Sequence, residues 1–361
     1  MRKSTAIMVW ITAFLLAITY FGVNIYFNHF DPGEDVVYET GEPETKVYTK
    51  TLTVSAVGDC TLATDIYMAS SISFDSVYKS IDKDPGYFFE NVRDYFVEDD
   101  LTIVNFEGAL SDDGIREIKQ YAFRGKPEYA KILTESSIEA ANLANNHSYD
   151  YGEKAFNDTK EILSDSDVAH FGMKEYAVKV INGIKIGLVG TNALNYEGRA
   201  SFPKVIEKLK KKENPDLIIA SFHWGEELDK IPNYIQKNLA HQAIDNGADL
   251  VLGHHPHVLQ GIEKYKGKYI VYSLGNFCFG GNHNPTDKDS MIFRQCFTFE
   301  NGDLIEDDEV SVIPCSISSQ KSKNDYKPTP LTGDEFERVK DKISARSENF
   351  EGIEYINFIE E

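Results

Sequence analysis

Side chains that can bind metal ions or move protons recur where the apolar segments of this 361-residue chain end. In chain order they are Asp59, Asn105, Glu107, Asn145, Asn146, His147, His223, His254, His255, His257 and Asn276. Five of the nine histidines fall in this set, a concentration that packing in a core does not explain. Because ligands bind at the carboxyl ends of strands in open α/β sheets, we expect these side chains to form one site.

Taken singly, several of these residues have an ordinary structural interpretation. Asp59 after a glycine is compatible with a turn or a helix N-cap, and Glu107 with a solvated loop. The segment GHHPH (253–257) differs, because three imidazoles within four positions are typical of a ligand cluster. Mixed nitrogen and oxygen donors suit Mn, Zn or Fe, whereas Ca²⁺ prefers a cage of oxygens alone. The set therefore predicts a divalent metal centre.

Apolar runs rich in β-branched residues predict the strands that carry these side chains. The expected strands are 51–58, 101–106, 138–144, 216–222, 248–253 and 269–274. Helices are expected between them, at 87–98, 153–164, 202–212 and 232–246. Strands that alternate with helices indicate a layered α/β domain.

Two further segments predict antiparallel pairing beside the parallel strands. Asn182-Gly183 divides the alternating run 177–190, and Asn301-Gly302 divides the strands expected from 292 onward. We expect the main domain to cover 51–315. The remaining residues, 316–361, would form a surface loop to 331 and then a helix over 332–347, packed on the domain or extending it.

The N-terminus predicts a membrane anchor. Residues 5–27 carry no charge, and as a helix they would extend about 35 Å, enough to cross a hydrocarbon core of about 30 Å. Arg2 and Lys3 before this run place the N-terminus in the cytoplasm and the rest of the chain outside the cell. A cleaved signal peptide is the alternative, but no small-x-small cleavage pattern follows. We therefore expect a single-pass anchor (1–27) and an acidic linker (28–50).

Charge and cysteine content exclude several classes of protein. With 37 Lys and Arg against 58 Asp and Glu, the formal charge is −21, which argues against nucleic acid as a partner. The four cysteines form no CxxC pair, so neither a zinc finger nor a thioredoxin-like site is expected.

Six segments, in order, resemble the motifs of the bacterial capsule synthesis (CapA) family, which is named for a poly-γ-glutamate capsule biosynthesis protein. They are VGDCTL (57–62), VNFEGAL (104–110), NLANNHSYDYG (142–152), SFHWGEE (221–227), GHHPHVLQG (253–261) and YSLGNFCF (272–279). The resemblance spans about 52–300. It implies a four-layer α/β/β/α sandwich of the calcineurin-like metallophosphoesterase type, with two divalent ions (Mn, Zn or Fe).

The resemblance also implies roles for individual residues. The implied metal ligands are Asp59, Glu107, Asn146, His223, His255 and His257. His147 resembles the catalytic histidine, with Asp150 as its orienting partner, and we expect Asn105, His254 and Asn276 to contact substrate. This sequence has Asp59-Cys60-Thr61 where the superfamily usually has Asp-x-His, so one histidine ligand is missing. The doubled histidine leaves open whether His254 replaces His255.

Two hypotheses of function follow. In the first, the chain is a membrane-anchored hydrolase or transferase that acts outside the cytoplasm on a phosphoester or on the γ-glutamyl amide of a capsule polymer. In the second, it is a non-catalytic subunit of the polymer synthesis and export complex that holds or guides the chain. The missing histidine after Asp59 favours the second hypothesis, and His147 favours the first. A soluble nucleotidase is a third possibility, against which the predicted anchor argues.

Overall fold

The computed structural model of the protein describes residues 48–360, apart from the side chains of 306–308. The predicted anchor and nearly all of the predicted linker lie outside these residues. Within the described range, no helix is both long enough and apolar enough to cross a membrane. The described residues form one compact unit.

A nine-stranded mixed sheet contains the first metal-type residues. Its strands are β1 (Thr49–Thr61), β2 (Leu101–Phe106), β5 (Ala140–Asn142), β6 (Ala169–Phe171), β13 (Asn276–Phe279), β14 (Asp289–Glu300), β15 (Asp303–Ser316), β16 (Thr329–Pro330) and β17 (Asn357–Phe358). The main order is β16-β15-β14-β1-β2-β5-β6, while β13 pairs with β1 and β17 with β15. Strands β2 and β13 run parallel to β1, whereas β14 is antiparallel to it.

A six-stranded sheet contains His223 and His254 and leads into the rest of the GHHPH segment. Its strands are β7 (Tyr176–Ile181), β8 (Ile184–Asn192), β9 (Leu217–His223), β10 (Leu250–His254), β11 (Ile262–Tyr265) and β12 (Lys268–Val271). Their order is β11-β12-β10-β9-β8-β7, with a parallel centre and antiparallel strands at both edges. A separate short pair joins β3 (Ala109–Leu110) to β4 (Arg124–Gly125).

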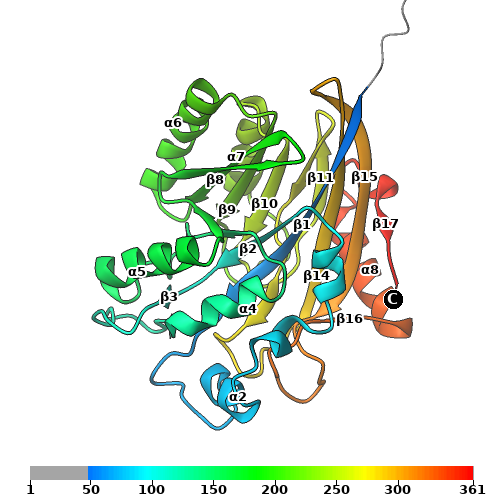
Figure 1. The fold of residues 1–361 in the computed structure, drawn as a ribbon. Coiled ribbons are helices and arrows are strands. Elements are labelled where there is room, and N and C mark those ends of the chain that lie inside the picture. The colour runs from blue at the N-terminus through cyan, green and yellow to red at the C-terminus, as the bar shows by residue number, and fades with distance from the viewer. Residues whose placement is uncertain (1–47, 361) are drawn as a thin grey trace, which may run out of the picture. The chain divides into compact units, whose positions relative to one another are not determined.

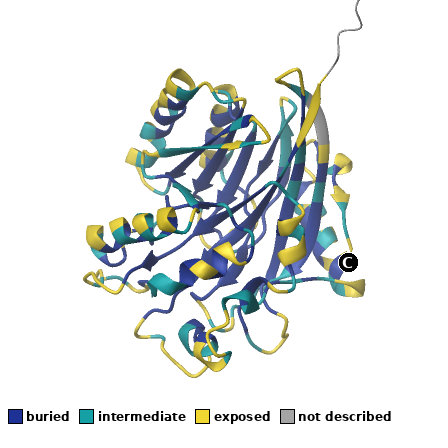
Figure 2. Cartoon of the chain, viewed as in Figure 1, coloured by how far each residue is buried: buried dark blue, intermediate teal, exposed yellow. Residues whose placement is uncertain are grey.

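The two sheets pack face to face, and helices cover their outer faces, apart from the last helix, which packs into the core that both sheets share (Figure 1). The helices are α2 (Phe74–Ser80), α3 (Arg93–Val97), α4 (Ala130–Thr134), α5 (Gly152–Asp165), α6 (Tyr196–Glu213), α7 (Tyr234–Asp245) and α8 (Gly333–Ser347), with 3₁₀ turns η1 (Pro85–Phe89), η2 (Pro127–Tyr129) and η3 (Ile353–Tyr355). One apolar core joins Val54 and Ile103 of the first sheet to Ile219 of the second. Figure 2 shows both sheets buried between helices whose outer surfaces are exposed. The layers are therefore helix, sheet, sheet and helix.

The predicted strands and hairpins are confirmed as elements. All six expected runs contain a strand, although the third is only the three residues of β5. Asn182 and Gly183 turn between β7 and β8 with φ of 54° and 78°, and Asn301 and Gly302 turn between β14 and β15 with φ of 53° and 98°. Positive φ at both central residues is what a tight two-residue hairpin turn requires. The helices expected at 153–164, 232–246 and 332–347 are α5, α7 and α8.

Three expectations are wrong in detail. The helix expected over 87–98 is divided into η1 and α3, because Asn91 donates to Thr329 Oγ1 (2.9 Å) and the chain leaves helical geometry at Val92. Helix α6 begins at Tyr196, six residues before the expected start. The expected surface loop at 316–331 is partly core, since Tyr326 is fully buried and donates to the carbonyl of Ile72 (2.7 Å).

Candidate metal centre

Strand register brings the predicted ligands to one edge of both sheets. In the first sheet, Asp59 pairs in register with Asn105 of β2 on one side and with Asn276 of β13 on the other. In the second sheet, His254 at the end of β10 lies opposite His223 at the end of β9. Parallel pairing thus places carboxylates from one sheet and imidazoles from the other at neighbouring strand ends.

Close backbone packing fixes the position of Asp59. The amide of Asp59 donates to the carbonyl oxygen of Gly275 (2.9 Å). A Cβ atom on Gly58 would lie only 2.2 Å from that same oxygen, so any larger residue would push the two segments apart. Glycine at position 58 therefore allows β1 to approach the segment that leads into β13.

Asn105 links the two buried carboxylates. Its Nδ2 lies 2.8 Å from Asp59 Oδ1, 3.5 Å from Glu107 Oε1 and 3.3 Å from His223 Nδ1, while its Oδ1 accepts from Asn142 Nδ2 (2.9 Å). All of these side chains are buried. Both ends of the Asn105 amide are therefore engaged inside the protein, where they orient Asp59 and Glu107. Its expected contact with substrate stays a prediction.

The GHHPH segment bends around Asp59. Oδ2 of Asp59 accepts from the backbone amide of His255 (3.2 Å) and lies 3.1 Å from His257 Nδ1, while Oδ1 lies 3.3 Å from His254 Nδ1. His255 and His257 have φ of 96° and 56°, a region that non-glycine residues enter at a cost of about 1–3 kcal/mol each. This strained turn brings the imidazoles of His254 and His257 to the carboxylate, as a ligand cluster requires.

His223 joins the histidine cluster to Asn146. Its Nε2 lies 2.7 Å from Asn146 Oδ1 and 3.7 Å from Glu107 Oε1, and its ring centroid lies 4.7 Å from that of His255. On the other side of the cluster, His257 Nδ1 lies 2.8 Å from Asn276 Oδ1. These contacts connect the predicted ligands from both sheets into one network.

Two overlapping groups of donors are close enough together to hold a cation. The ligand atoms of Asp59, Glu107 and His257 all lie within 4.8 Å of one another, as do those of Glu227, His255 and His257. Glu227 is exposed, and it was not among the ligands expected from the sequence. The only indication in the sequence was that Glu227 belongs to the same motif as His223, SFHWGEE.

Burial and the charges of neighbouring groups shift the pKa values of the carboxylates and imidazoles in this centre. Burial raises the pKa of Glu107 to about 8, and the charge of Asp59 adds to the rise. Burial also acts on Asp59, but His254 and His257 outweigh it and hold the pKa of Asp59 well below its usual range. Burial lowers the pKa of His257, yet Asp59 and Glu107 raise it to about 10. Protons on Glu107 and His257 thus offset the buried negative charge.

The donor set fits a divalent metal ion. Burial lowers the pKa of His223 well below its usual range and that of His255 to about 4, so both imidazoles are neutral and able to coordinate at neutral pH. Nδ1 of His255 and Nε2 of His254 are both buried without a hydrogen-bond partner among the described residues. Orphaned imidazole nitrogens beside two buried carboxylates are the pattern that a bound cation would complete.

A second cluster holds His147 at the edge of the centre. Asp150 Oδ2 lies 2.8 Å from His147 Nδ1 and accepts from the backbone amide of Phe123 (2.6 Å). Asp150 Oδ1 pairs with Lys119 Nζ (2.5 Å), which also donates to the carbonyl of Asn146 (2.8 Å). The Phe123 ring lies 4.6 Å from the His147 imidazole. Sequence reasoning missed Lys119 and Phe123, because the segment that carries them has no periodic pattern.

Cys60 does not replace the missing histidine. Its thiol is buried and points toward the carbonyl of Gly58 (3.6 Å). Burial raises the pKa of the Cys60 thiol, and the thiolate is the form that binds metals. Cys60 and Cys278 are both free thiols.

All eleven residues predicted for the site therefore lie in one connected region. Asp59, Glu107, His223, His254 and His257 form its centre, and Asn105, Asn146 and Asn276 bond to members of that centre. His255 contacts His223 and His257 by ring packing, and His147 with Asp150 follows Asn146 in the chain. The catalytic, ligand and substrate roles assigned to them stay predictions.

Comparison with known proteins identifies the family. Residues 53–281 match the sequence profile of the bacterial capsule synthesis protein family PGA_cap. The chain belongs to this family. The match contains every predicted site residue, so the centre described above is part of the capsule synthesis domain itself.

Named relatives in this family come from several bacteria. The chain is 34% identical over 264 residues to the capsule biosynthesis protein CapA of Bacillus anthracis, a match that covers 66% of this chain and 63% of that protein. It is 29% identical over 275 residues to the PGA biosynthesis protein CapA of Bacillus subtilis, covering 69% of each. A probable polyglutamine synthesis accessory protein of Mycobacterium tuberculosis is 24% identical over 258 residues, covering 62% of this chain and 67% of that one.

Similar solved structures are remote. The protein TT1561 of Thermus thermophilus aligns with a TM-score of 0.40 and 10% identity, over 67% of this chain and 94% of that one. Purple acid phosphatase PPD1 from yellow lupin seeds aligns with a TM-score of 0.31 and 10% identity, over 72% of this chain and 53% of that one.

Proposed function

We propose that the protein is a metal-dependent hydrolase or transferase of poly-γ-glutamate capsule biosynthesis, with a calcineurin-like metallophosphoesterase domain. Residues 5–27 anchor it in the cell membrane, and the domain acts outside the cytoplasm, beside the capsule synthesis and export machinery. The names of the Bacillus relatives support the capsule role. Because the match covers 63% of the Bacillus anthracis protein, the activity of the whole relative is part of this proposal.

The observation that carries the proposal is the meeting of Asp59 and Glu107 with three imidazoles from the opposite sheet. Asp59, Glu107 and His257 would hold one cation, and Glu227 with His255 and His257 would hold another. His223 and Asn146, which already contact each other, complete the donor set. Divalent cations bound there would supply Lewis-acid polarisation of a phosphoryl or acyl oxygen.

His147 performs the proton transfer in this proposal. Asp150 holds Nδ1 at 2.8 Å, which leaves Nε2 as the nitrogen that exchanges a proton with the reacting group. The imidazole side chain is 10% exposed, so it reaches solvent although its partner is fully buried. Burial lowers the pKa of His147, while Asp150 opposes the change. The imidazole is therefore neutral at pH 7, the form that can accept a proton.

The deciding experiment measures turnover and metal content on the same preparations. The purified 361-residue chain is supplied with Mn²⁺ or Zn²⁺ and offered a γ-glutamyl oligomer and a phosphodiester, with and without chelator. We expect His147→Ala to lower turnover by about 10²–10⁴-fold with metal content unchanged. We expect His223→Ala to lose metal as well. His170→Ala is the matched control, because His170 bonds to Ser164 outside the centre.

Two results would contradict the catalytic proposal. If His147→Ala loses as much metal as His223→Ala, then His147 is a ligand. If the metal-loaded chain cleaves neither substrate but binds the oligomer, the chain is a polymer-guiding subunit. The buried, protonated thiol of Cys60, beside the position where the superfamily has a histidine, favours that second function.

A further inference from the structure

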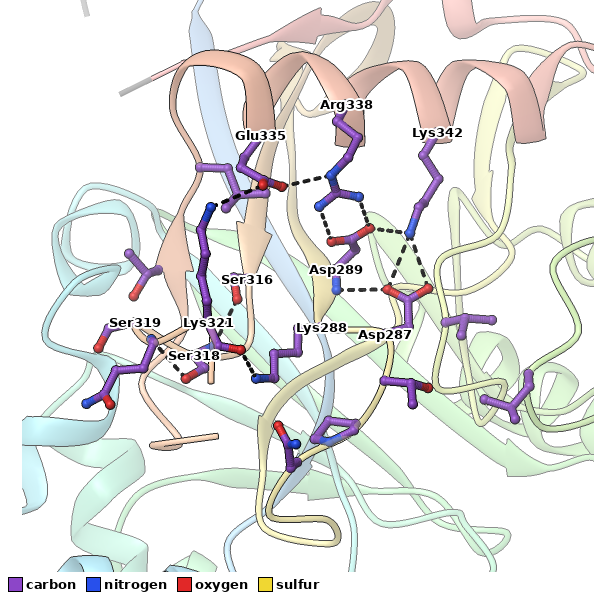
Figure 3. A pocket seen from close by; sticks show the side chains of 18 of the residues that line it. Asp287, Lys288, Asp289, Ser316, Ser318, Ser319, Lys321, Glu335, Arg338 and Lys342 are labelled. Carbon is purple, nitrogen blue, oxygen red and sulfur yellow. Dashed lines mark hydrogen bonds and ion pairs between the residues drawn. The ribbon is translucent and has the colours of Figure 1, made fainter. Parts of the chain in front are cut away.

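A pocket of about 930 Å³ lies beside the metal centre and is lined by residues that the proposed mechanism does not use. Its walls come from helix α8, from the segment that leads into β14 and from the segment that follows β15. Figure 3 shows Arg338 and Lys342 reaching from α8 toward Asp289 and Asp287 on the facing segment. The pocket is therefore an organised polar cavity between elements that are distant in the sequence.

The charge of the pocket is opposite to that of the whole chain. Its cationic residues are Lys230, Lys288, Lys321, Arg338 and Lys342, and its acidic residues are Asp287, Asp289 and Glu335. Five cations against three carboxylates give a net charge of +2, in a chain whose formal charge is −21. An anionic ligand that the rest of the surface repels would find local attraction here.

All three carboxylates are already neutralised by partners within the pocket. Arg338 holds both oxygens of Asp289 at 2.7 Å and donates through Nε to Glu335 (2.8 Å). Lys342 contacts Asp289 and lies 3.2 Å from Asp287. The acidic groups therefore serve to fix α8 against the β14 strand.

Positive charge remains after this pairing. Lys288 Nζ donates to the backbone carbonyls of Lys321 (2.8 Å) and Lys323 (3.0 Å), which carry no formal charge to offset it. Lys230 is exposed and forms no ion pair with any of the described side chains. The pocket thus holds two cations without a carboxylate partner in the described part of the chain, which is the lining that a carboxylate-bearing ligand requires.

The wall of the pocket continues into the metal centre. Val258, which lines the pocket, follows His257 directly, and Leu228 donates its amide to the carbonyl of Pro256 (2.8 Å). Ser290, the residue after Asp289, bonds to the carbonyl of Asn276, whose side chain holds His257. These links place the pocket next to the metal centre.

We propose that the pocket is a subsite for the carboxylates of a glutamyl polymer whose reacting bond lies at the metal centre. The inference rests on the proposed function, since it takes the polymer as the ligand of that centre. Repeated carboxylates along the polymer would pair with Lys230 and Lys288, and with Lys321 in exchange for its solvent-exposed pairing with Glu335 (3.3 Å). Leu228 and Val258 would border the passage between the sites.

The test measures binding separately from turnover. The 361-residue chain carrying His147→Ala is loaded with Mn²⁺ and titrated with a fluorescent γ-glutamyl oligomer. The titration is then repeated with the same chain carrying Lys230→Glu and Lys321→Glu as well. We expect about tenfold weaker binding, since each exposed ion pair contributes up to about fivefold. Lys211→Glu with Lys212→Glu on α6 is the matched control, because it changes the net charge equally at exposed positions away from the pocket.

The possible outcomes separate the subsite from the catalytic proposal. Equal weakening by both lysine pairs, or tighter binding of polyphosphate than of the glutamyl oligomer, would overturn the subsite. Loss of binding confined to the Lys230 and Lys321 pair would support it, even if the wild-type chain cleaved nothing. Turnover of the polymer with an unchanged KM in that pair would leave the catalytic proposal standing and refute the subsite alone.

Discussion

Replacing Lys119 with methionine tests whether the cluster around His147 is built as described. The ammonium group of Lys119 lies 2.5 Å from Asp150 Oδ1 and 2.8 Å from the carbonyl of Asn146. Methionine keeps most of the length of the side chain but removes the charge and both hydrogen bonds. Asp150 is fully buried, so it would lose the cation that balances it, while its bonds to His147 and Phe123 would remain.

The expected loss of stability in Lys119→Met follows from these contacts. A hydrogen bond to a charged group contributes about 1.5–3 kcal/mol, and removing one partner of a buried ion pair costs about 3–5 kcal/mol. The Lys119 side chain is 24% exposed, so water can replace part of the interaction. We therefore expect Lys119→Met to lower the free energy of unfolding by about 2 kcal/mol. Turnover should fall by about tenfold or more, because His147 would lose a firmly held partner.

Urea denaturation measures the first effect, and turnover at fixed metal content measures the second. Lys154→Met is the matched control, since Lys154 is 64% exposed and pairs with Asp158 four residues later on α5. Because that pair lies on the exposed surface of the helix, it should contribute little to stability. If Lys119→Met were no less stable than Lys154→Met, the buried ion pair would not hold the cluster, and the positioning of His147 would need another explanation.

Two further substitutions test the packing and charge around the first sheet. Burial raises the pKa of Asp99 to about 7, so the folded chain binds this proton more tightly than the unfolded chain and loses stability as pH rises from about 4 to 7. Asp99→Asn should therefore stabilise the protein at pH 8 by about 1–3 kcal/mol and have little effect at pH 4. Urea denaturation at the two pH values measures this difference. Equal effects at both would refute the raised pKa of Asp99. Gly58→Ala should lower stability by about 1–3 kcal/mol and weaken metal binding, because its Cβ would meet the carbonyl of Gly275. Gly86→Ala, whose nearest contact would be 3.3 Å away, is the control, and comparable losses in both variants would contradict the steric argument.

The strand ends of the candidate site could be predicted because buried parallel strands have a simple sequence signature. Such strands are continuous apolar runs, and LTIVNF coincides with β2 residue for residue. The polar residue after each run then marks the edge of the sheet. The tight turns were readable for a related reason, since Asn-Gly permits the positive φ that both hairpins show.

Features made by pairing between distant segments could not be predicted in this way. Lys119 reaches Asp150 from a segment without periodicity, and the division of the helix expected over 87–98 depends on Thr329, 238 residues from Asn91. The basic pocket has the same origin, because Arg338 meets Asp289 only after α8 has packed beside β14. Local sequence patterns do not indicate such contacts, so these contacts can be identified only from the folded structure.

The metal centre couples the two sheets, because neither supplies a complete donor set. Asp59 and Glu107 belong to the first sheet, and His223 with the GHHPH segment to the second. Below this edge the sheets share an apolar core, whereas at the edge burial, with the charge of Asp59 adding to it, raises the pKa of Glu107 to about 8. A divalent cation would replace the protons that now offset this charge and would bind only the assembled sheets. Its binding free energy would therefore add to the stability of the fold, so the residues that favour chemistry at this edge would also hold the sheets together.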